Sequence, residues 1–208
     1  MLNTNKTSSA NNDHYKITLP KFDRSLFFGE NKNIGTDPGK ILNEIGVNKN
    51  DVVVDFGCGV GFFILDSGVR VGEGGKVIAV DIDQNMLESV KKKAMESGLK
   101  NIYGIKADLE TPGATKLGNE SADLVLVINL LYLVNKKQEV INEAARILKS
   151  GGRLAVMDWK DKSDKTMLEK HQIISSTEIK NMARKAELSL QKNFEAGISH
   201  EVNVFTKK

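Results

Sequence analysis

The chain contains 208 residues, 40% of them hydrophobic and 27% charged, and its 30 Lys and Arg nearly balance its 27 Asp and Glu, giving a formal net charge of +3. This length suits one domain with a sizeable core, and the balance of charge excludes a strongly basic coat for nucleic acid or membrane surfaces. The single cysteine, Cys58, excludes a disulfide framework or a zinc site of several thiolates. The histidines His14, His171 and His200 lie far apart, so we predict no metal site.

The sequence shows no pattern of a targeting signal or a membrane span. Residues 1–16 are rich in Asn, Ser and Thr and lack the apolar stretch of a signal peptide. The most apolar segment, 124–134, contains Asn129 and is too short for the roughly 20 residues of a bilayer span. We expect a cytoplasmic protein with a flexible segment over residues 1–20 and one domain over residues 21–208, because the first segment offers little apolar surface to offset the entropy of ordering.

Strand-like and helix-like segments alternate from residue 36 onward. Short β-branched or apolar runs between turn residues predict strands over 51–56, 76–80, 101–107, 123–128 and 153–158. Helical spacing and capping residues predict helices over 38–45, from the glycine-rich turn to about 71, from 84 until Gly98, over 135–148, and from the capping box 175–178. The last two strands, 188–194 and 202–205, are close enough to form an antiparallel hairpin.

This alternation predicts an α/β fold with a mostly parallel sheet, right-handed crossovers and helices on both faces. Ligands of such sheets bind beyond the carboxyl ends of the strands, where the strand order reverses. The polar or glycine-rich positions that directly follow the apolar strands are therefore candidates for a site: 57–61, 81–83, Asp108, Asn129 and Asp158.

The turn after the first strand is the most informative segment. Its glycines follow the pattern G-x-G-x-G at Gly57, Gly59 and Gly61, with Asp55 two residues before the first. Dinucleotide folds use G-x-G-x-x-G and place a pyrophosphate at the helix N-terminus, where a carboxylate at Asp55 would oppose it. A cationic ligand such as S-adenosylmethionine, which carries an ammonium and a sulfonium, suits this acid better. The alternative is that Asp55 only orders the loop by accepting backbone hydrogen bonds.

Two further acids follow the next two strands. Asp81 ends the second strand, where a carboxylate can accept hydrogen bonds from both hydroxyls of a ribose. Ile82 offers an apolar face to adenine, and Asp108 is positioned to bind the exocyclic amine of adenine. Taken alone, Asp108 is equally consistent with a surface loop acid. Together, the acids and glycines at successive strand ends indicate an adenosine-containing ligand.

The chain resembles the class I S-adenosylmethionine-dependent methyltransferases. The segments VVVDFGCGVG, VIAVDID, KADLE and SADLVLVINLLYLV are similar to their first four motifs, and KSGGRLAVMDW to a strand of the ubiquinone/menaquinone-biosynthesis-type members. The ending ISHEVNVF is similar to that of small, mainly prokaryotic members. The resemblance covers roughly residues 22–208 and implies a seven-stranded Rossmann-like sheet of order 3-2-1-4-5-7-6 with an antiparallel final strand. It places S-adenosylmethionine against Asp55, Gly57, Cys58, Gly59, Gly61, Asp81, Ile82, Asp108, Leu109 and Asn129.

Differences between this sequence and the motifs of particular subfamilies restrict the class of methyl acceptor. The residues after the fourth strand, 128–131, read Ile-Asn-Leu-Leu and lack the Pro-Pro-aromatic run of enzymes that methylate adenine amines. One cysteine is too few for arsenite methylation, and Cys58 fits a small residue in the loop better than a reactive thiol. The basic run 91–93 lies on the polar face of a helix, so nothing favours nucleic acid. We therefore predict a small-molecule methyl acceptor; the sequence does not indicate an oligomeric state.

The sequence also offers candidates for the residues that act on the acceptor. Tyr132, Asp158 and His200 are the polar candidates for the substrate side, and a general base is needed only if the acceptor atom loses a proton. Each has a structural alternative: Tyr132 as a core aromatic, Asp158 as a loop cap and His200 as a turn residue. Three other functions stay open at this point: a cofactor-binding regulator without activity, an RNA methyltransferase and an NAD-dependent oxidoreductase, although no Tyr-x-x-x-Lys pair supports the last.

Overall fold

The computed structural model describes residues 37–160, 174–197 and 200–208. The segment expected to be flexible, residues 1–20, lies outside these ranges, as do His14 and His171. That residues 21–208 form one domain stays a prediction.

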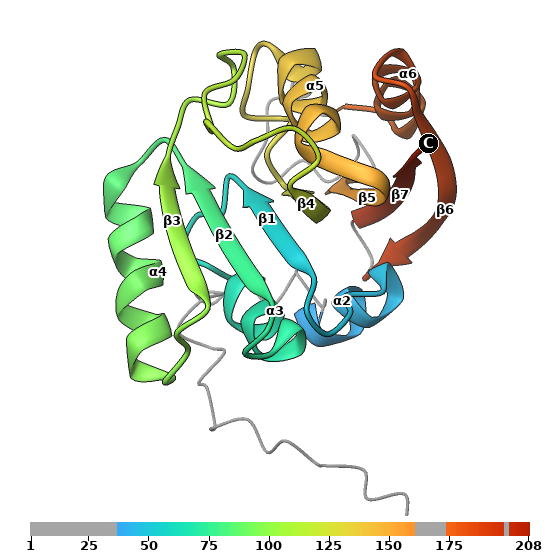
Figure 1. Ribbon diagram of the computed structural model, residues 1–208. Coiled ribbons are helices and arrows are strands. Elements are labelled where there is room, and N and C mark those ends of the chain that lie inside the picture. Colours follow the sequence, from blue (N-terminus) through green and yellow to red (C-terminus); the bar gives the residue numbers. More distant parts are fainter. Residues whose placement is uncertain (1–36, 161–173, 198–199) are drawn as a thin grey trace, which may run out of the picture.

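Seven strands form one sheet in the order β3-β2-β1-β4-β5-β7-β6, which confirms the predicted order (Figure 1). Strands β1 to β5 are parallel, and β7 is antiparallel to both of its neighbours, β5 and β6. The order reverses between β1 and β4, so the carboxyl ends of these two strands border the crevice where ligands of such sheets bind. The strands are β1 (Val52–Phe56), β2 (Lys76–Asp81), β3 (Ile102–Lys106), β4 (Ala122–Ile128), β5 (Leu148–Trp159), β6 (Leu188–Ala196) and β7 (His200–Lys207).

Helices cover both faces of the sheet, as Figure 1 shows. On one face, α2 (Pro38–Ile45), α3 (Ile64–Val71) and α4 (Gln84–Glu96) pack on a core that includes Val53, Ala79 and Met157. On the other face, α5 (Lys137–Ile147) and α6 (Ser176–Lys185) pack on a core that includes Val54 and Val156. Neighbouring residues of one strand thus belong to different cores, as the period of two in a strand requires. This alternation decides which face each polar residue at a strand end points to.

Local capping residues fix the helix ends that the sequence predicts. The Asp37 side chain accepts a hydrogen bond from the Gly39 backbone at 2.8 Å, and Gly46 ends α2 with φ of 86°. Asp83 accepts from the backbone of Asn85 at the start of α4. The predicted capping box is present at α6, where Ser175 and Glu178 bond reciprocally to each other's backbone.

The fifth strand is longer than predicted. We expected a helix to residue 148 and a strand from residue 153, but α5 ends at Ile147 and β5 begins at Leu148. Leu148 already pairs with Ala122 of β4, and the register shifts once before Leu124 pairs with Arg153. This irregularity accommodates the segment that carries Gly151, with φ of 76°. Because a long-range pairing keeps these residues in the sheet, local turn signals alone misplace the boundary.

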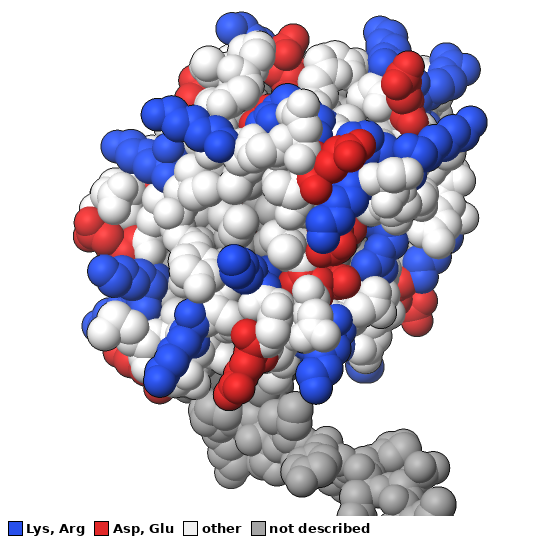
Figure 2. All heavy atoms as spheres, in the orientation of Figure 1, with Lys and Arg blue, Asp and Glu red and all other residues white. Residues whose placement is uncertain are grey.

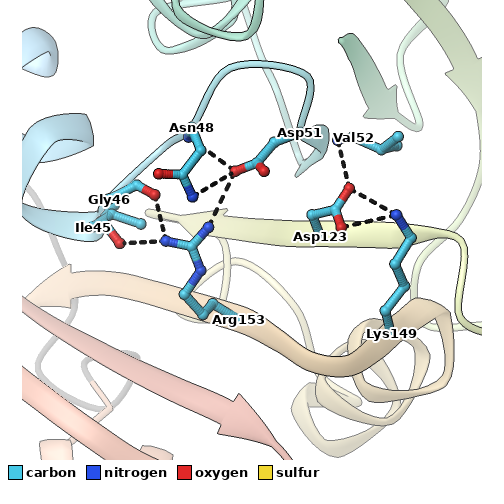
Figure 3. A network of polar contacts seen from close by, with 8 residues as sticks. All are labelled: Ile45, Gly46, Asn48, Asp51, Val52, Asp123, Lys149 and Arg153. Atoms are coloured by element: carbon cyan, nitrogen blue, oxygen red, sulfur yellow. Dashed lines mark hydrogen bonds and ion pairs between the residues drawn. The ribbon is translucent and has the colours of Figure 1, made fainter.

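A polar network joins the loops at the amino end of the sheet, opposite the predicted site (Figure 3). Arg153 donates to the carbonyl oxygens of Ile45 at 3.0 Å and of Gly46, and pairs with Asp51 at 3.1 Å. In the same region, Asp123 accepts from the backbone of Val52 at 2.8 Å and pairs with a lysine of β5. These contacts fix α2 and the entry of β1 against β4 and β5.

Membrane-spanning potential and surface charge can both be examined in the described part of the chain. No helix within the described ranges is long and apolar enough to cross a bilayer. Figure 2 shows lysines and arginines interspersed with acidic residues over the face in view.

Candidate functional site

The glycine-rich turn between β1 and α3 leaves one open position. Gly57, Gly59 and Gly61 all have positive φ, of 69°, 50° and 86°, in the left-handed region that glycine adopts without strain. A Cβ at Gly57 would lie 2.8 Å from Leu130, and one at Gly61 would lie 2.8 Å from Val90. Among the described residues, a Cβ at Gly59 would meet nothing within 4 Å. Gly57 and Gly61 are therefore required by packing, whereas Gly59 faces free space that a ligand can enter.

Asp55 and Asp81 lie on the same face of the sheet, next to this turn. Asp55 pairs with Ala79 in the β1–β2 ladder, and Asp81 lies two residues beyond Ala79, so both side chains point to the α2–α3–α4 face. Asp81 accepts hydrogen bonds at 2.9 Å from the backbone N–H of Gly59 and at 2.9 Å from that of Asp83. The loop-ordering role that we considered for Asp55 is thus performed by Asp81.

Asp55 and Asp81 make this end of the sheet acidic on the α2–α3–α4 face. Asp55 is only 3% exposed, and burial, together with the neighbouring charge of Asp81, raises the pKa of Asp55 to about 8. Within the described ranges, no lysine or arginine forms an ion pair with either carboxylate. A buried carboxyl without a cation is costly to ionise, so a ligand that brings a positive charge is favoured at this place.

Cys58 is a packing residue of the turn. Its side chain is buried in the core on the α3 side, and its backbone N–H, like that of Gly57, donates to the carbonyl of Val80. Burial, followed by the charges of Asp55 and Asp81, raises the pKa of the Cys58 thiol. A thiol kept protonated is a poor nucleophile, which agrees with the expectation that Cys58 is not reactive.

The next predicted contacts differ in what they offer to a ligand. Ile82 is 63% exposed beside Asp81, as a platform for an adenine ring requires. The exposed Asp108 accepts from the backbone of Glu110 at 2.9 Å and from the hydroxyl of Thr111 at 3.4 Å, so it orders the turn after β3. The side chain of Leu109 is buried in the α5-side core, which leaves only its backbone to face a ligand.

Asn129 combines two unusual features at the end of β4. Its φ is 51°, a left-handed conformation in which asparagine is the side chain most often found after glycine. Its backbone N–H donates to the carbonyl of Met157 at 2.8 Å, while its Oδ1 is buried with no hydrogen-bond partner in the described structure. Buried polar atoms are rarely left unpaired, so this oxygen is available to a donor group of a ligand.

The predicted substrate-side residues are divided between the two faces. Asp158, 2% exposed, alternates with Met157 and points to the α5–α6 face. Burial raises its pKa to about 6, and this rise is opposed by backbone N–H groups of Trp159, Tyr132 and Leu131 and by a nearby lysine. Asp158 therefore contacts the backbone of the loop after β4 as well as that of Trp159. The half-buried Tyr132 lies near it, since burial and Asp158 both raise the pKa of Tyr132.

His200 lies on the opposite face, with Asp55 and Asp81. It is the first residue of β7, only 1% exposed, and burial lowers its pKa to about 4. It is thus a buried strand residue rather than the exposed turn residue considered as its alternative. Its ring stacks on that of Trp159, with centroids 4.3 Å apart. Sequence reasoning missed Trp159, although a tryptophan directly after Asp158 must point to the other face of the strand.

No metal site is formed in the described part of the chain, where no group of three or more His, Cys, Asp or Glu residues is close enough to hold an ion. The site consists instead of an open glycine turn, two carboxylates on one face of the sheet without an ion pair among the described residues, and polar residues at the ends of β4 and β5.

A family model described as a methyltransferase domain matches residues 47–197. The chain belongs to this family.

Curated relatives cover this core in part. Aklanonic acid methyltransferase DauC of Streptomyces sp. (strain C5) is 36% identical over 103 residues, which are 50% of this chain and 46% of DauC. Ubiquinone/menaquinone biosynthesis C-methyltransferase UbiE of Pectobacterium carotovorum is 32% identical over 115 residues, 55% of this chain and 45% of UbiE. The chain therefore spans about half the length of the curated relatives it matches.

Solved structures share the fold at low identity. A SAM-dependent methyltransferase from Aquifex aeolicus superimposes with a TM-score of 0.78 at 24% identity, over 90% of this chain and 100% of that one. The [4+2]-cyclase SpnF superimposes with a TM-score of 0.69 at 12% identity, over 81% and 80% of the two chains. Because one of these proteins is a cyclase, the fold by itself does not define the reaction.

Proposed function

We propose that this protein transfers a methyl group from S-adenosylmethionine to a small-molecule acceptor. The observation that carries the proposal is the pair of carboxylates, Asp55 and Asp81, on one sheet face beside the open position at Gly59, with no cationic partner among the described residues. An ammonium group beside Asp55 would supply the missing charge. A pyrophosphate at the same place would bring negative charge beside two acidic side chains that have no cationic partner among the described residues, which argues against a dinucleotide.

The residues of this chain fit the cofactor from one end to the other. Asp55 would bind its ammonium group, Asp81 the two hydroxyls of its ribose, and the exposed Ile82 one face of its adenine, with Asp108 near the adenine amine. The backbone of the glycine turn would border it at Gly59. When bound, S-adenosylmethionine supplies a methyl carbon attached to a positively charged sulfur. The protein then has to orient the acceptor toward that carbon and exclude water.

The acceptor is proposed to be a small molecule. Both curated relatives are named for reactions on small molecules, and basic and acidic side chains are mixed over the surface in Figure 2. A cofactor-binding protein without activity would share the two acids, so binding alone does not separate it from an enzyme. Nothing described here favours that alternative over catalysis.

Calorimetry tests the cofactor. S-adenosylmethionine and S-adenosylhomocysteine, which both carry the ammonium and the ribose, are expected to bind, and NAD is expected not to. Preferential binding of NAD would overturn the proposal. Incubation of a metabolite extract with methyl-labelled S-adenosylmethionine tests the reaction, and a labelled small molecule is the expected product. Cofactor binding without a labelled product from any extract would instead support the non-catalytic binding protein.

A further inference from the structure

The last residue of β5 and the first residue of β7 form a stacked aromatic pair. Trp159 and His200 lie directly opposite each other in the antiparallel ladder, with ring centroids 4.3 Å apart and an angle of 39° between the ring planes. The indole Nε1 and the imidazole Nε2 are both buried, and neither has a hydrogen-bond partner in the described structure. Two neighbouring side chains thus each leave one nitrogen unsatisfied.

Such a pair needs an explanation, because most buried polar atoms in proteins are hydrogen-bonded. Met157 and Val202, two residues away from Trp159 and His200 on the same strands, belong to the hydrophobic core of this face. Neither nitrogen has a hydrogen-bond partner among the described residues. The unsatisfied atoms are therefore best explained by a polar group of a ligand.

The chemistry of the two nitrogens restricts that group. An indole N–H can only donate a hydrogen bond. Burial lowers the pKa of His200 to about 4, so its ring is neutral at pH 7, and the tautomer with a lone pair on Nε2 accepts a hydrogen bond. With His200 in that tautomer, a group that satisfies both nitrogens must accept one hydrogen bond and donate another. A hydroxyl does both through a single oxygen, whereas an ammonium only donates and a carboxylate only accepts.

The pair lies on the same face of the sheet as Asp55 and Asp81. Asp55 is level with Ala155 of β5, through Leu126 of β4. Trp159 is four residues beyond Ala155 toward the carboxyl end, which at the rise of a strand is roughly 13 Å. One strand, β4, lies between β5 and β1, so the sideways separation is two strand spacings, or roughly 10 Å. This separation of Asp55 from the pair is compatible with the combined length of a cofactor and a small acceptor.

We propose that Trp159 and His200 bind a hydroxyl group of the acceptor, and that His200 takes up its proton as the methyl group is transferred. The proposal rests on the methyltransferase function proposed above. The hydroxyl oxygen accepts from Nε1 of Trp159 and donates to Nε2 of His200. As this oxygen bonds to the methyl carbon, the carbon–sulfur bond breaks and its electron pair stays on sulfur. The hydroxyl proton passes to Nε2, so that the positive charge lost by sulfur reappears on the imidazolium.

The chain offers a direct probe, because Trp159 is its only tryptophan. Its indole N–H proton resonance and its fluorescence report on this site alone. We would titrate phenol, anisole and toluene into the protein, both free and loaded with S-adenosylhomocysteine. Phenol can donate and accept a hydrogen bond, anisole can only accept, and toluene can do neither. Phenol is expected to bind roughly tenfold more tightly than toluene, with anisole between them, and to shift the indole resonance.

Variants separate the two nitrogens. In His200→Phe, phenol should lose its advantage over anisole, while S-adenosylhomocysteine binds within roughly twofold of wild type. Tyr103→Phe, on the edge strand β3 far from the pair, should leave the phenol preference unchanged. Equal affinities for the three probes in the wild-type protein would overturn the proposal, as would a phenol preference that survives in His200→Phe. The titration without S-adenosylhomocysteine tests the hydroxyl site by itself. Failure of S-adenosylhomocysteine to bind would count only against the methyltransferase function.

Discussion

The carboxylate of Asp81 accepts a hydrogen bond of 2.9 Å from the backbone N–H of Gly59. The acid that ends β2 thereby holds the turn that leaves the neighbouring strand β1, at the glycine that faces open space. A ligand ribose bound by Asp81 would be positioned against this turn. One side chain thus orders the loop and supplies the proposed ribose contact, which makes it the most sensitive position of the site.

Replacement of Asp81 should weaken cofactor binding more than it weakens the fold. Asp81→Ala removes the acceptor for the ribose and for Gly59, and loss of hydrogen bonds to a charged group costs about 1–3 kcal/mol. Asp83→Ala removes the neighbouring N-cap of α4, which should lower the free energy of unfolding by about 1 kcal/mol with little effect on affinity. Calorimetry and urea unfolding of both variants check this. Unchanged affinity in Asp81→Ala would remove Asp81 from the site.

Binding of the cofactor should release a proton. The pKa of Asp55 is raised to about 8 by burial and by Asp81, so this carboxyl is mostly protonated at pH 7. An ammonium group placed beside it favours the ionised form. Calorimetry at pH 7 in buffers of different ionisation enthalpy should report the release of close to one proton per S-adenosylhomocysteine, and of much less at roughly pH 9.

Two controls isolate the ammonium group and the acid. Adenosine lacks the amino-acid end of the cofactor and should bind without releasing a proton. Asp55→Asn cannot ionise and should abolish the proton release that S-adenosylhomocysteine causes. Equal proton release by adenosine and S-adenosylhomocysteine would show that the ammonium is not bound beside Asp55.

The raised pKa of Asp55 also predicts the direction in which stability depends on pH. The unfolded chain loses this proton near the ordinary value of 3.8, whereas the folded protein keeps it until about pH 8. The native state therefore binds more protons between these values, and the free energy of unfolding should fall as pH rises through this window. Urea midpoints of the wild type and Asp55→Asn, measured at intervals across it, should diverge, with the variant gaining relative stability toward pH 8. Parallel profiles would show that Asp55 ionises normally in the folded protein.

The sequence predicts the fold well where local signals determine it, and less well where distant pairing does. The capping box at Ser175 and the end of α2 at Gly46 are local, and both predictions are confirmed. The start of β5 is not local, because pairing of Leu148 with Ala122 keeps a glycine-containing segment in the sheet. From the sequence we also predicted that Asp158 and His200 both face the substrate. The alternation of side chains along β5 and the β5–β7 register direct them to opposite faces of the sheet. The sequence pattern identified the polar residues but not the face of the sheet to which each side chain points.

The glycine turn offers a matched pair of substitutions that separates packing from ligand access. At Gly61, φ is 86° and a new Cβ would lie 2.8 Å from Val90. Gly61→Ala therefore combines backbone strain with a steric clash and should cost about 2–4 kcal/mol of unfolding free energy.

At Gly59 the same substitution meets no described protein atom within 4 Å, so only the strain of a left-handed alanine remains, about 1–2 kcal/mol. Its methyl group would project into the space proposed for the cofactor, so Gly59→Ala should bind S-adenosylhomocysteine at least roughly tenfold more weakly while it stays folded. Urea unfolding and calorimetry on the two variants measure both effects. Wild-type affinity in a folded Gly59→Ala would mean that the cofactor does not approach the chain at this glycine. A cofactor bound against Gly59 would collide with the added methyl group.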